Sequence, residues 1–371
     1  MPSQPNKVDV LIFGAGIAGL GVAMALAKKG KRVLVVGRDL EGEASPRAAG
    51  ILNPFLGLDR GSPMLPLTMK AFRGFPSFIR EIEKKTGLKA GYKKSGVLYV
   101  ALDRAETAGL RKKYEWQRKL PLGAHWQESA ELHRLHPELA SEVKAGVFYR
   151  EVSRIHPGKM MKAVTAYARK LGVRILKTGK APRLERLPDG TFFVKAGGSV
   201  YRAPVVVNAA GSWSRSKDLF SAFLPVEPAR GQILILKGRS KLSTILHSVK
   251  EGYIVPWEGG RYLAGSTVEF VGHKAEVTAQ GVHSILRSLD RILPSVRNMK
   301  IERSWAGLRP YSDKPILGKH PHIKNLYFAT GYFRSGILLG PYLGSLLAEM
   351  IVTGKQPVEL RRFRAKGGAK A

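Results

Sequence analysis

The sequence predicts a mixed α/β fold, α+β overall, in which a nucleotide-binding domain assembled from separate stretches of the chain carries a second domain built on an antiparallel sheet. Three observations predict it. A strand, a glycine-rich turn and a helix follow one another at the N-terminus, and a strand, a glycine loop and a helix return near the C-terminus. Between them, several segments alternate apolar and polar residues, which is typical of antiparallel strands with one exposed face.

The first elements predict a dinucleotide site. Residues 8–13 form a continuous apolar strand, and residues 17–29 form a helix that ends at two lysines and Gly30. Between them, GAGIAG (14–19) has the glycine spacing that permits a tight turn, close approach of a pyrophosphate and close packing of the helix. Residues 33–36 form the second strand, which we expect to lie parallel to the first through a right-handed crossover.

The end of the second strand leaves the choice of dinucleotide open. An acidic residue normally stands there and binds the adenosine ribose, but this chain has Gly37 followed by Arg38. Glycine and arginine together also suit the 2′-phosphate of NADP. Asp39 or Glu41, in the loop that follows, offers another carboxylate for the ribose.

The middle of the chain alternates helices with short strands. RAETAGLRKKYEWQRKL (104–120) and HPGKMMKAVTAYARKL (156–171) have amphipathic helical spacing, and SGVLYVAL (95–102) contains a short strand. VVVNAAG (205–211) is a buried strand that runs into a glycine. The predicted antiparallel strands lie in GQILILKG, GYIVPWEGGRYLAGST and VEFVGH, and NLYFATGYFRSGILLGP returns to a strand, a glycine loop and a helix.

These elements predict two domains and a short tail. The nucleotide-binding domain is discontinuous and comprises residues 1–75, 145–222 and 305–365. Residues 76–144 and 223–304 form the substrate domain, and residues 366–371 are a basic tail. A length of 371 residues agrees with two domains at about 150 residues each.

The charge of the chain is unusual, with 62 Lys and Arg against 28 Asp and Glu, a formal net charge of +34. The last eleven residues, RRFRAKGGAKA, contribute only five of these charges, so the folded body itself is basic. Such a field favours polyanions, anionic membrane surfaces or acidic substrates. A generally basic proteome is an equally open explanation.

The composition also excludes several kinds of chemistry. The chain has no cysteine, which excludes disulfides, thiolate nucleophiles and cysteine-ligated zinc. Residues 10–27 form an uncharged run, but four glycines interrupt it and no signal-peptide features frame it. We therefore expect a soluble cytoplasmic protein without a transmembrane segment. The oligomeric state is not predicted.

Several blocks of the sequence together resemble one family. They are SPRAAGILNP, VVVNAAGSWS, FLPVEPARGQILIL, GYIVPWEGGRYLAGST, WAGLRPYSDKPILG and GYFRSGILLGP, in this order along nearly the whole chain. The sequence resembles the D-amino-acid oxidase-like family of FAD-dependent oxidoreductases, and within it the glycine oxidases most closely. The resemblance implies a Rossmann-like FAD-binding domain, with FAD as the cofactor. It also implies that Gly37→Glu, by restoring the ribose-binding acid, tightens FAD binding.

The resemblance implies a set of cofactor-binding residues. They lie in the glycine-rich turn, at the end of the second strand, in the loop after it, in the middle block and at the start of the last helix: Gly14, Gly16, Ile17, Ala18, Gly19, Arg38, Asp39, Ser45, Arg47, Ala48, Ala49, Gly50, Ala181, Ala210, Gly211, Ser335, Gly336, Ile337 and Leu338. The N-terminus of the last helix suits the flavin ring, where reduction places negative charge.

Three residues are implied on the substrate side. Arg309 matches the carboxylate-binding arginine, and a guanidinium suits a carboxylate because it makes two parallel charge-assisted hydrogen bonds. Tyr253 matches a tyrosine that holds the substrate, and Arg334 matches a second active-site arginine. Tyr332 stands where relatives often have histidine, and Trp257 where they often have arginine, so the substrate cavity is expected to differ in shape or polarity.

The implied chemistry is amine oxidation. A neutral amine delivers a hydride from its α-carbon to the flavin, the imine hydrolyses, and dioxygen accepts the electrons to give hydrogen peroxide. Such a reaction needs no dedicated acid or base. The nine histidines show no paired spacing and are interpreted as structural or surface residues, and no metal site is predicted.

Three functions follow from these features. The first is an oxidase of a small amino acid such as glycine or sarcosine. The second is a tRNA-modifying oxidase that acts on a carboxymethylaminomethyl group of wobble uridine, which the net charge of +34 favours. The third is an FAD dehydrogenase that passes electrons to a membrane acceptor, for which residues 111–120 would offer an amphipathic helix.

Overall fold

The N-terminal elements form the centre of a six-stranded sheet in the computed structural model, which describes residues 5–179, 183–250 and 252–365. Strands β2 (Val10–Phe13) and β3 (Val33–Arg38) are parallel, as predicted, and α1 (Ile17–Ala27) connects them. The sheet is buried on both faces, which explains the continuous apolar runs of these strands.

Strands from three distant parts of the chain make up this sheet. Its order is β10–β3–β2–β14–β21–β20, with β10 at Arg174–Thr178, β14 at Val205–Asn208, β21 at Leu326–Thr330 and β20 at Ile316–Lys319. All neighbouring strands are parallel except β20, which is antiparallel to β21 at the edge. Sheet formation therefore brings the N-terminal, middle and C-terminal parts of the chain together.

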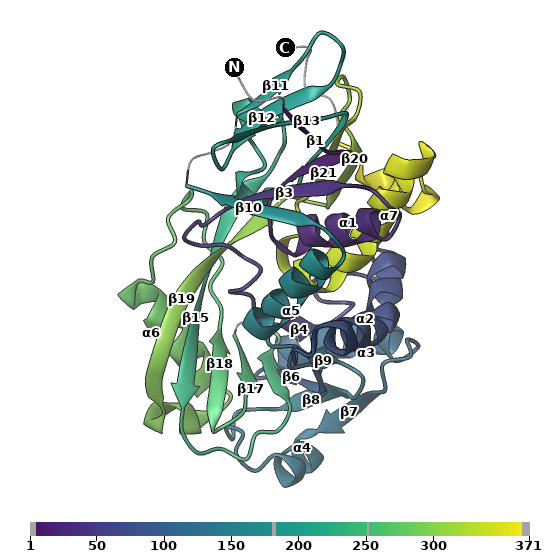
Figure 1. Cartoon of the computed structure of the whole chain (residues 1–371). Coiled ribbons are helices and arrows are strands. Elements are labelled where there is room, and N and C mark those ends of the chain that lie inside the picture. The colour runs from purple at the N-terminus through teal and green to yellow at the C-terminus, as the bar shows by residue number, and fades with distance from the viewer. Residues whose placement is uncertain (1–4, 180–182, 251, 366–371) are drawn as a thin grey trace.

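Helices cover one face of the six-stranded sheet and a smaller sheet covers the other (Figure 1). Successive side chains of β2 point to opposite faces of the sheet, so Val10 and Ile12 pack on the helices, whereas Leu11 and Phe13 pack on the smaller sheet. The helices are α1, α2 (Leu65–Thr86), α5 (Pro157–Lys170) and α7 (Gly336–Thr353). The smaller sheet has the order β1 (Asn6–Lys7), β13 (Ser199–Ala203), β12 (Phe192–Ala196) and β11 (Leu184–Arg186).

Glycines let α1 and α7 touch backbone to backbone. A Cβ atom added at Gly344 would lie 2.5 Å from the carbonyl carbon of Gly21, and one at Gly340 would lie 3.0 Å from the Ile17 side chain. Residues 333–353, which include α7, are long and apolar enough to cross a membrane, but half of this stretch is buried in the protein. Its apolar composition is explained by its packing against α1 and α2.

The predicted antiparallel sheet has eight strands. Its order is β19 (Lys300–Tyr311), β15 (Glu227–Lys237), β18 (Arg261–Gly265), β17 (Tyr253–Pro256), β16 (Ile245–Ser248), β6 (Val97–Ala101), β8 (Ala145–Tyr149) and β7 (Ala124–Glu128). All pairs are antiparallel except β16 and β6. The prediction is wrong for residues 268–273, which form a single bridge between Glu269 and Arg230 and no strand. The Glu269 carboxylate accepts hydrogen bonds from the side chains of Arg230 and Gln232.

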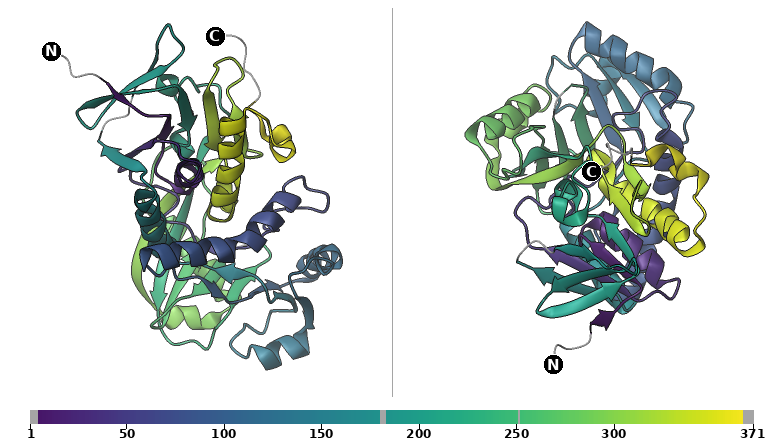
Figure 2. Two further views of the ribbon diagram at one scale, coloured as in Figure 1. Left: turned by 45° about the vertical axis from the view of Figure 1, so that its right-hand side comes forward. Right: turned by 90° about the horizontal axis from the view of Figure 1, so that it is seen from above.

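Each face of this large sheet has its own hydrophobic core. Leu234 and Leu236 of β15 pack on α6 (Ala279–Asp290), and Ile233 and Ile235 pack on the opposite side. Helix α2 lies between the two large sheets (Figure 2), and its buried residues contact both cores. The remaining helices are α3 (Arg104–Gln117) and α4 (Ser129–Leu135), and a small sheet joins β4 (Ile51–Leu52), β9 (Ser153–Arg154) and β5 (Lys93–Lys94).

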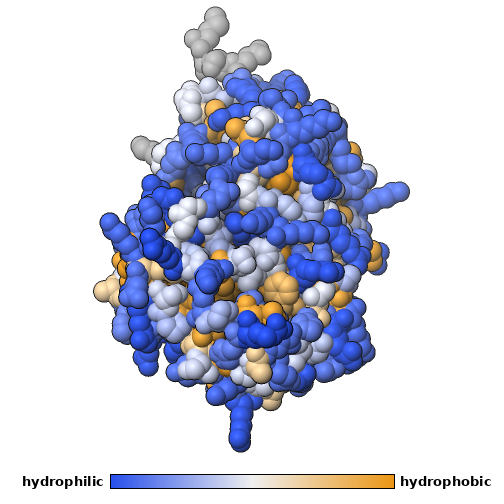
Figure 3. All heavy atoms as spheres, turned by 90° about the horizontal axis from the view of Figure 1, so that it is seen from below, coloured by the Kyte–Doolittle hydropathy of each residue, from blue (hydrophilic) through white to orange (hydrophobic). Residues whose placement is uncertain are grey.

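Two of the predicted domain boundaries divide an element or a sheet of the structure. The boundary after residue 75 lies inside α2, which is a single helix. The boundary after residue 144 precedes β8, which pairs with β6 and β7 in the eight-stranded sheet. The division into a nucleotide-binding and a substrate domain stays a prediction. On the face seen from below (Figure 3), hydrophilic residues surround several small hydrophobic areas.

Candidate active site

A single cavity of about 1340 Å³ lies where the two large sheets meet. The carboxyl ends of β2, β3, β14 and β21 line one part of it, and residues of β6, β15, β16, β17 and β19 line the other. Ligands of open α/β sheets bind at this edge. Because pockets for one small molecule usually measure roughly 300 to 1000 Å³, this cavity has room for a dinucleotide and a substrate.

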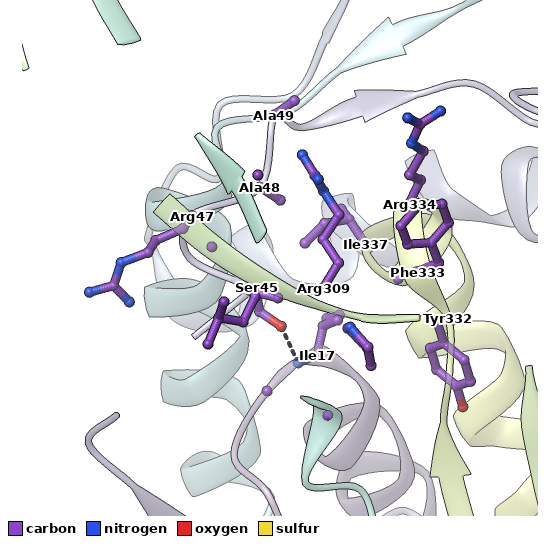
Figure 4. Close-up of a pocket in the computed structure, with 18 of the residues that line it drawn as sticks. Ile17, Ser45, Arg47, Ala48, Ala49, Arg309, Tyr332, Phe333, Arg334 and Ile337 are labelled. Atoms are coloured by element: carbon purple, nitrogen blue, oxygen red, sulfur yellow. Dashed lines mark hydrogen bonds between the residues drawn. The ribbon is translucent and has the colours of Figure 1, made fainter. Parts of the chain in front are cut away.

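The glycine-rich turn lines the part of the cavity that lies at the six-stranded sheet. Gly14 has φ +109°, and a Cβ there would lie 2.2 Å from the Ala209 carbonyl oxygen. A Cβ at Gly19 would lie 1.9 Å from the Gly14 carbonyl oxygen, so α1 begins directly against the turn. The Ser45 hydroxyl accepts a hydrogen bond of 3.0 Å from the Ile17 amide (Figure 4). This bond attaches the loop after β3 to the helix N-terminus.

Two helix N-termini reach the cavity, which suits an anionic cofactor. Ile17 and Ala18 of α1 line it, as do Gly336 and Ile337 of α7. Neither helix has a side-chain cap at its N-cap residue or an acidic residue in its first turn. Apart from the Ile17 amide, which donates to Ser45, the amides of these first turns and the positive ends of the helix dipoles suit a pyrophosphate or a reduced flavin ring.

The loop after β3 and the turn after β14 form the walls beside these helices. Ser45, Arg47, Ala48, Ala49 and Gly50 line the cavity, together with Ala210 and Gly211. Gly50 has φ +75°, and a Cβ there would lie 2.0 Å from the Ile155 carbonyl oxygen. The Trp305 indole donates to the Arg47 carbonyl oxygen at 3.0 Å, and the Arg47 side chain points away from Arg309 (Figure 4). The predicted segment therefore borders the cavity mainly through its backbone.

The end of β3 differs from the prediction. Asp39 is exposed and forms an ion pair with Lys177, and it does not line the cavity. Glu41 is exposed as well, whereas Glu43 is half-buried, lines the cavity and has a pKa raised mainly by burial. Arg38 also lines it, and its buried Nε has no hydrogen-bond partner among the described residues. Glu43 is therefore the acid of this loop that faces the cavity.

Three other predicted cofactor residues do not line the cavity. Gly19 packs against Gly14, and Leu338 is 3% exposed within the helical core. The Ser335 amide donates to the Tyr332 carbonyl oxygen in the turn before α7. These residues shape the site without bordering it. Ala181 lies outside the described residues.

Arg309 stands at the far end of β19, opposite Ala229 of β15. Its Nη1 donates to the Thr267 carbonyl oxygen at 3.0 Å, and its Nη2 donates to the Ser266 hydroxyl at 2.9 Å. The Tyr253 side chain also interacts with the guanidinium, so a ligand carboxylate would use the N–H groups that Thr267, Ser266 and Tyr253 leave. Burial lowers the pKa of Arg309. A Cβ at Gly231 would lie 2.0 Å from Nη2, so glycine is required beneath the guanidinium.

A polar network holds the loop that anchors Arg309. The Glu269 carboxylate accepts from the Thr267 hydroxyl at 2.5 Å, from the Gln232 amide at 2.8 Å and from the buried Arg230 guanidinium. The same contacts, against the opposing effect of burial, lower the pKa of Glu269. Loop 266–269 is thereby tied to β15, and the orientation of Arg309 follows from it.

Aromatic rings form a row beside Arg309. The rings of His247 and Tyr253 lie 5.6 Å apart, and His247 stacks on Tyr99 at 4.7 Å. The Asn53 amide donates to the Tyr99 hydroxyl at 2.8 Å. His247 Nδ1 lies 2.6 Å from the Ser248 carbonyl oxygen, which requires the proton on Nδ1 and leaves Nε2 as an acceptor. Burial lowers the pKa of His247 to about 4, so the ring is neutral at physiological pH.

Two further cations line the substrate end of the cavity, Arg334 before α7 and Lys113 of α3. Arg309 and Arg334 extend toward the same side of the cavity (Figure 4). Tyr332 points the other way and is buried, with no partner for its hydroxyl in the described chain, and Trp257 stacks on His156 outside the cavity.

Among the cavity-lining residues that sequence reasoning did not single out are Glu43, Tyr99, Lys113 and His247. None of them belongs to a recognisable spacing, and only the fold brings them to the glycine-rich turn. His247 corrects the interpretation of all histidines as structural or surface residues. In the described chain, no group of three or more His, Cys, Asp and Glu could hold a metal ion.

Comparisons with known proteins agree with this geometry. The family model DAO, described as FAD dependent oxidoreductase, matches residues 9–350. The bifunctional protein ThiO/ThiG of Nostoc sp. (strain PCC 7120) is 31% identical over 96% of this chain, and the chain spans 54% of its length. The glycine oxidase of Geobacillus kaustophilus is 28% identical over 96% of both chains.

The chain is also similar in fold to solved structures. The crystal structure of glycine oxidase from Geobacillus kaustophilus has a TM-score of 0.89 at 25% identity, covering 98% of this chain and 100% of the other. The crystal structure of iminodiacetate oxidase from Chelativorans sp. BNC1 has a TM-score of 0.85 at 26% identity, covering 96% of this chain and 98% of the other. The fold class predicted from the sequence is confirmed by these matches.

Proposed function

Since the chain belongs to the DAO family of FAD-dependent oxidoreductases, and is an enzyme with FAD as cofactor that acts on CH–NH or CH–NH2 donors, we propose that it oxidises a small amino acid of the glycine or sarcosine type. Relatives that bear the name glycine oxidase support this choice. The observation that carries it is Arg309, whose guanidinium lines the same cavity as the glycine-rich turn and lies beside Tyr253.

Arg309 binds the carboxylate of the substrate in this proposal. Its fork fixes the position of the carboxylate and therefore that of the α-carbon next to it, which is the main task of the protein in such a reaction. Tyr253, which lies beneath Gly265 and beside His247, adds a hydroxyl at the same end. A small amino acid suits this end because Tyr99, His247 and Tyr253 narrow it.

The amine must be neutral when it reacts, and the cavity favours that form. Arg309, Arg334 and Lys113 are cations that oppose a further positive charge, so they lower the pKa of a bound ammonium. Neutral His247 offers Nε2 as an acceptor for an amine N–H. FAD, when bound, supplies the acceptor for the two electrons that leave the α-carbon as hydride. The imine then hydrolyses in water.

The residues around the first part of the cavity are proposed to hold FAD. Their fit rests on two helix N-termini without an acidic residue in the first turn, on the closely packed Gly14 and Gly19, and on the Arg38 Nε, which has no hydrogen-bond partner in the described part of the chain. Ser45 positions the loop that runs beside the cofactor, and Glu43 provides the carboxylate for the ribose that position 37 lacks. We further propose dioxygen as the electron acceptor and a cytoplasmic location.

The test is the visible spectrum of the purified holoenzyme after nuclease treatment, recorded without oxygen. Glycine and sarcosine should bleach the flavin bands, and readmitted air should restore them with formation of hydrogen peroxide. Arg309→Met should raise KM by about a hundredfold, since a charge-assisted bidentate contact is lost, while FAD stays bound. Bleaching by hypomodified tRNA alone would replace this proposal with the tRNA-modifying oxidase. Slow reoxidation by air but rapid reoxidation by quinones would indicate a membrane acceptor.

A further inference from the structure

The register of the eight-stranded sheet places three cavity-lining rings in one row. Tyr253 of β17 pairs with His247 of β16, and His247 pairs with Tyr99 of β6. Residues that are paired directly on neighbouring strands point to the same face of the sheet. Tyr253, His247 and Tyr99 therefore follow one another across three strands, with neighbouring strands about 4.8 Å apart. All three rings line the cavity.

Arg309 lies at the Tyr253 end of this row. Its Nη2 donates to the Ser266 hydroxyl at 2.9 Å, and Ser266 directly follows the residue of β18 that pairs with Tyr253. The proposed function places the substrate carboxylate on Arg309 and the amine on His247. A substituent on the substrate nitrogen then lies on the side of Tyr99, because Tyr99 is the next residue in the row.

Tyr99 belongs to a cluster of four aromatic rings. It stacks on His247 at 4.7 Å, and its centroid lies 6.3 Å from that of Phe55 and 5.9 Å from that of Tyr149. All four residues line the cavity. Phe55 and Tyr149 are buried, whereas Tyr99 and His247 are half-buried and keep accessible surface. A further ring that contacts Tyr99 would therefore extend an existing aromatic cluster.

The hydroxyl groups of this cluster are directed at buried side chains. The Tyr99 hydroxyl accepts a hydrogen bond of 2.8 Å from the amide of Asn53, and the Tyr149 hydroxyl donates to Gln117. Among the described residues, no acid of α3, β6, β8 or β16 lines the cavity, and the exposed Lys113 of α3 opposes a cation there. The surface beside Tyr99 is thus made of ring carbons, which suit a neutral apolar group.

We propose that Tyr99 is a specificity-determining residue that binds an apolar ring on the substrate nitrogen, so that the substrate is a glycine with an arylmethyl group on its nitrogen, as in N-benzylglycine. This inference rests on the proposed function. Arg309 binds the carboxylate, His247 accepts from the amine, and Tyr99 packs against the ring. Loss of a hydride from the α-carbon and of a proton from the nitrogen, with the hydride accepted by FAD, forms an imine. Addition of water then gives glyoxylate and a primary amine that keeps the ring.

Binding of unreactive analogues tests the ring subsite independently of catalysis. 4-Phenylbutyrate and butyrate have the chains of N-benzylglycine and sarcosine with a methylene group in place of the nitrogen, so they cannot react as amines. Calorimetric titration of the holoenzyme should show 4-phenylbutyrate binding about tenfold more tightly than butyrate, because a ring is removed from water. Equal affinities would overturn the proposal. Tighter binding of glutarate than of 4-phenylbutyrate would do so as well, since the site would then favour a second anion.

Variants locate the preference at Tyr99. Tyr99→Ala should lower the ratio of the two affinities by about fivefold, whereas Tyr99→Phe should keep it, because the ring and not the hydroxyl makes the contact. Tyr114→Ala is the matched control: Tyr114 of α3 is half-buried against the same hydrophobic core but does not line the cavity, so the ratio should stay as in the wild type. The same fall in Tyr114→Ala would assign the effect to loosened packing and contradict the proposal.

A second variant covers the case in which Tyr99→Ala does not retain FAD. Tyr99→Leu keeps an apolar side chain against the core and should lower the ratio by about threefold, because the contacts between rings are lost. The visible spectrum of the bound flavin shows which variants remain folded. A ratio equal to that of the wild type in a folded Tyr99→Ala or Tyr99→Leu would show that Tyr99 does not bind the ring.

Catalysis separates this inference from the proposed function. We expect N-benzylglycine to have a kcat/KM about tenfold above that of sarcosine, with the difference in KM. If glycine and sarcosine reduce the flavin as well as N-benzylglycine does, and 4-phenylbutyrate binds no better than butyrate, the ring subsite is wrong and the amino-acid oxidase stands. If 4-phenylbutyrate binds tightly but none of the three amino acids reduces the flavin, the proposed oxidation is wrong and the ring subsite stands.

Discussion

At the scale of single residues, the end of β3 shows how a missing acid can be explained by packing. A Cβ at Gly37 would lie 2.8 Å from the Cβ of Ala15, inside the glycine-rich turn. Position 37 therefore has no room for a side chain unless the turn moves. The carboxylate that faces the cavity comes instead from Glu43, six residues later in the loop.

This contact reverses the expectation for Gly37→Glu. The variant should bind FAD at least tenfold more weakly, because a displaced Ala15 misaligns the amides that face the pyrophosphate. Gly37→Ala should show nearly the same loss, since the clash begins at Cβ. The measurement is the dissociation constant of FAD from the reconstituted apoprotein, followed by flavin fluorescence. Tighter binding by Gly37→Glu would restore the original expectation and contradict the geometry.

His247 makes stability depend on pH in a defined window. Its pKa is lowered from 6.5 to about 4 by burial, with smaller effects of Arg334 and Lys113, while the hydrogen bond to Ser248 acts in the opposite direction. Between these two pH values the unfolded chain binds a proton that the folded protein does not bind. The free energy of unfolding therefore falls as the pH is lowered through this window, by about 3 kcal/mol in total for this group.

Urea unfolding of the apoprotein at pH 7 and pH 4.5 measures this effect. His247→Phe keeps a ring against Tyr99 and should lose less stability between the two pH values than the wild type does. His283→Gln, which replaces an exposed histidine of α6, serves as the control. An equal fall in His247→Phe and the wild type would show that His247 is not the group responsible.

At the scale of elements, two long paired strands bring Arg309 to the cavity. Strands β15 and β19 pair along eleven or more residues each, from the core under α6 to the cavity. Arg309 lies near one end of this ribbon, and Gly231 faces it from β15. The sequence predicted an antiparallel strand in GQILILKG with one exposed face, whereas β15 is buried on both faces over most of its length. It did not predict where the end of this strand would lie.

The contact between α1 and α7 offers a test of how the nucleotide-binding elements are held together. Gly344→Ala should lower the free energy of unfolding by about 3 kcal/mol, because the new methyl group meets the backbone of α1 and cannot move aside. Gly74→Ala is a matched control in α2, where no atom lies within 4 Å of the added Cβ. It should raise stability by about 0.5 to 1 kcal/mol. Equal effects in thermal or urea unfolding would contradict the close packing.

At the scale of the whole molecule, a net charge of +34 acts on every anion that approaches. Hydrophilic residues cover most of the face seen in Figure 3, without a large continuous hydrophobic area there. A net positive charge attracts nucleic acids and other polyanions regardless of their sequence.

We therefore expect tRNA to bind weakly and regardless of its modification. Affinity should fall by about a hundredfold or more between 50 and 200 mM salt, because binding releases counterions. The measurement is fluorescence anisotropy of labelled tRNA, with fully modified and hypomodified tRNA compared at each salt concentration. Binding of hypomodified tRNA that is tighter and persists at high salt would contradict this and favour the tRNA-modifying oxidase.

The sequence by itself determined the fold class, FAD as the cofactor and the identity of the family, and it predicted the glycine-rich turn as a part of the cofactor site. These features depend on residues that are close in the chain, such as GAGIAG between its strand and helix, and on blocks that occur in a set order. Arg309 and Tyr253 were predicted because they belong to such blocks, and both line the cavity. The spacing of residues in a short segment is sufficient to predict a feature when that segment contains all the residues the feature needs.

Only the tertiary structure decided which other groups surround the substrate. Tyr99, Lys113 and His247 come from a strand, a helix and a second strand with ordinary patterns, and the pairing of β6 with β16 places Tyr99 next to His247. It also decided that Glu43, and not Asp39, lines the cavity, while Lys177 of β10 pairs with Asp39. Such choices depend on contacts between residues far apart in the chain, which no local pattern contains.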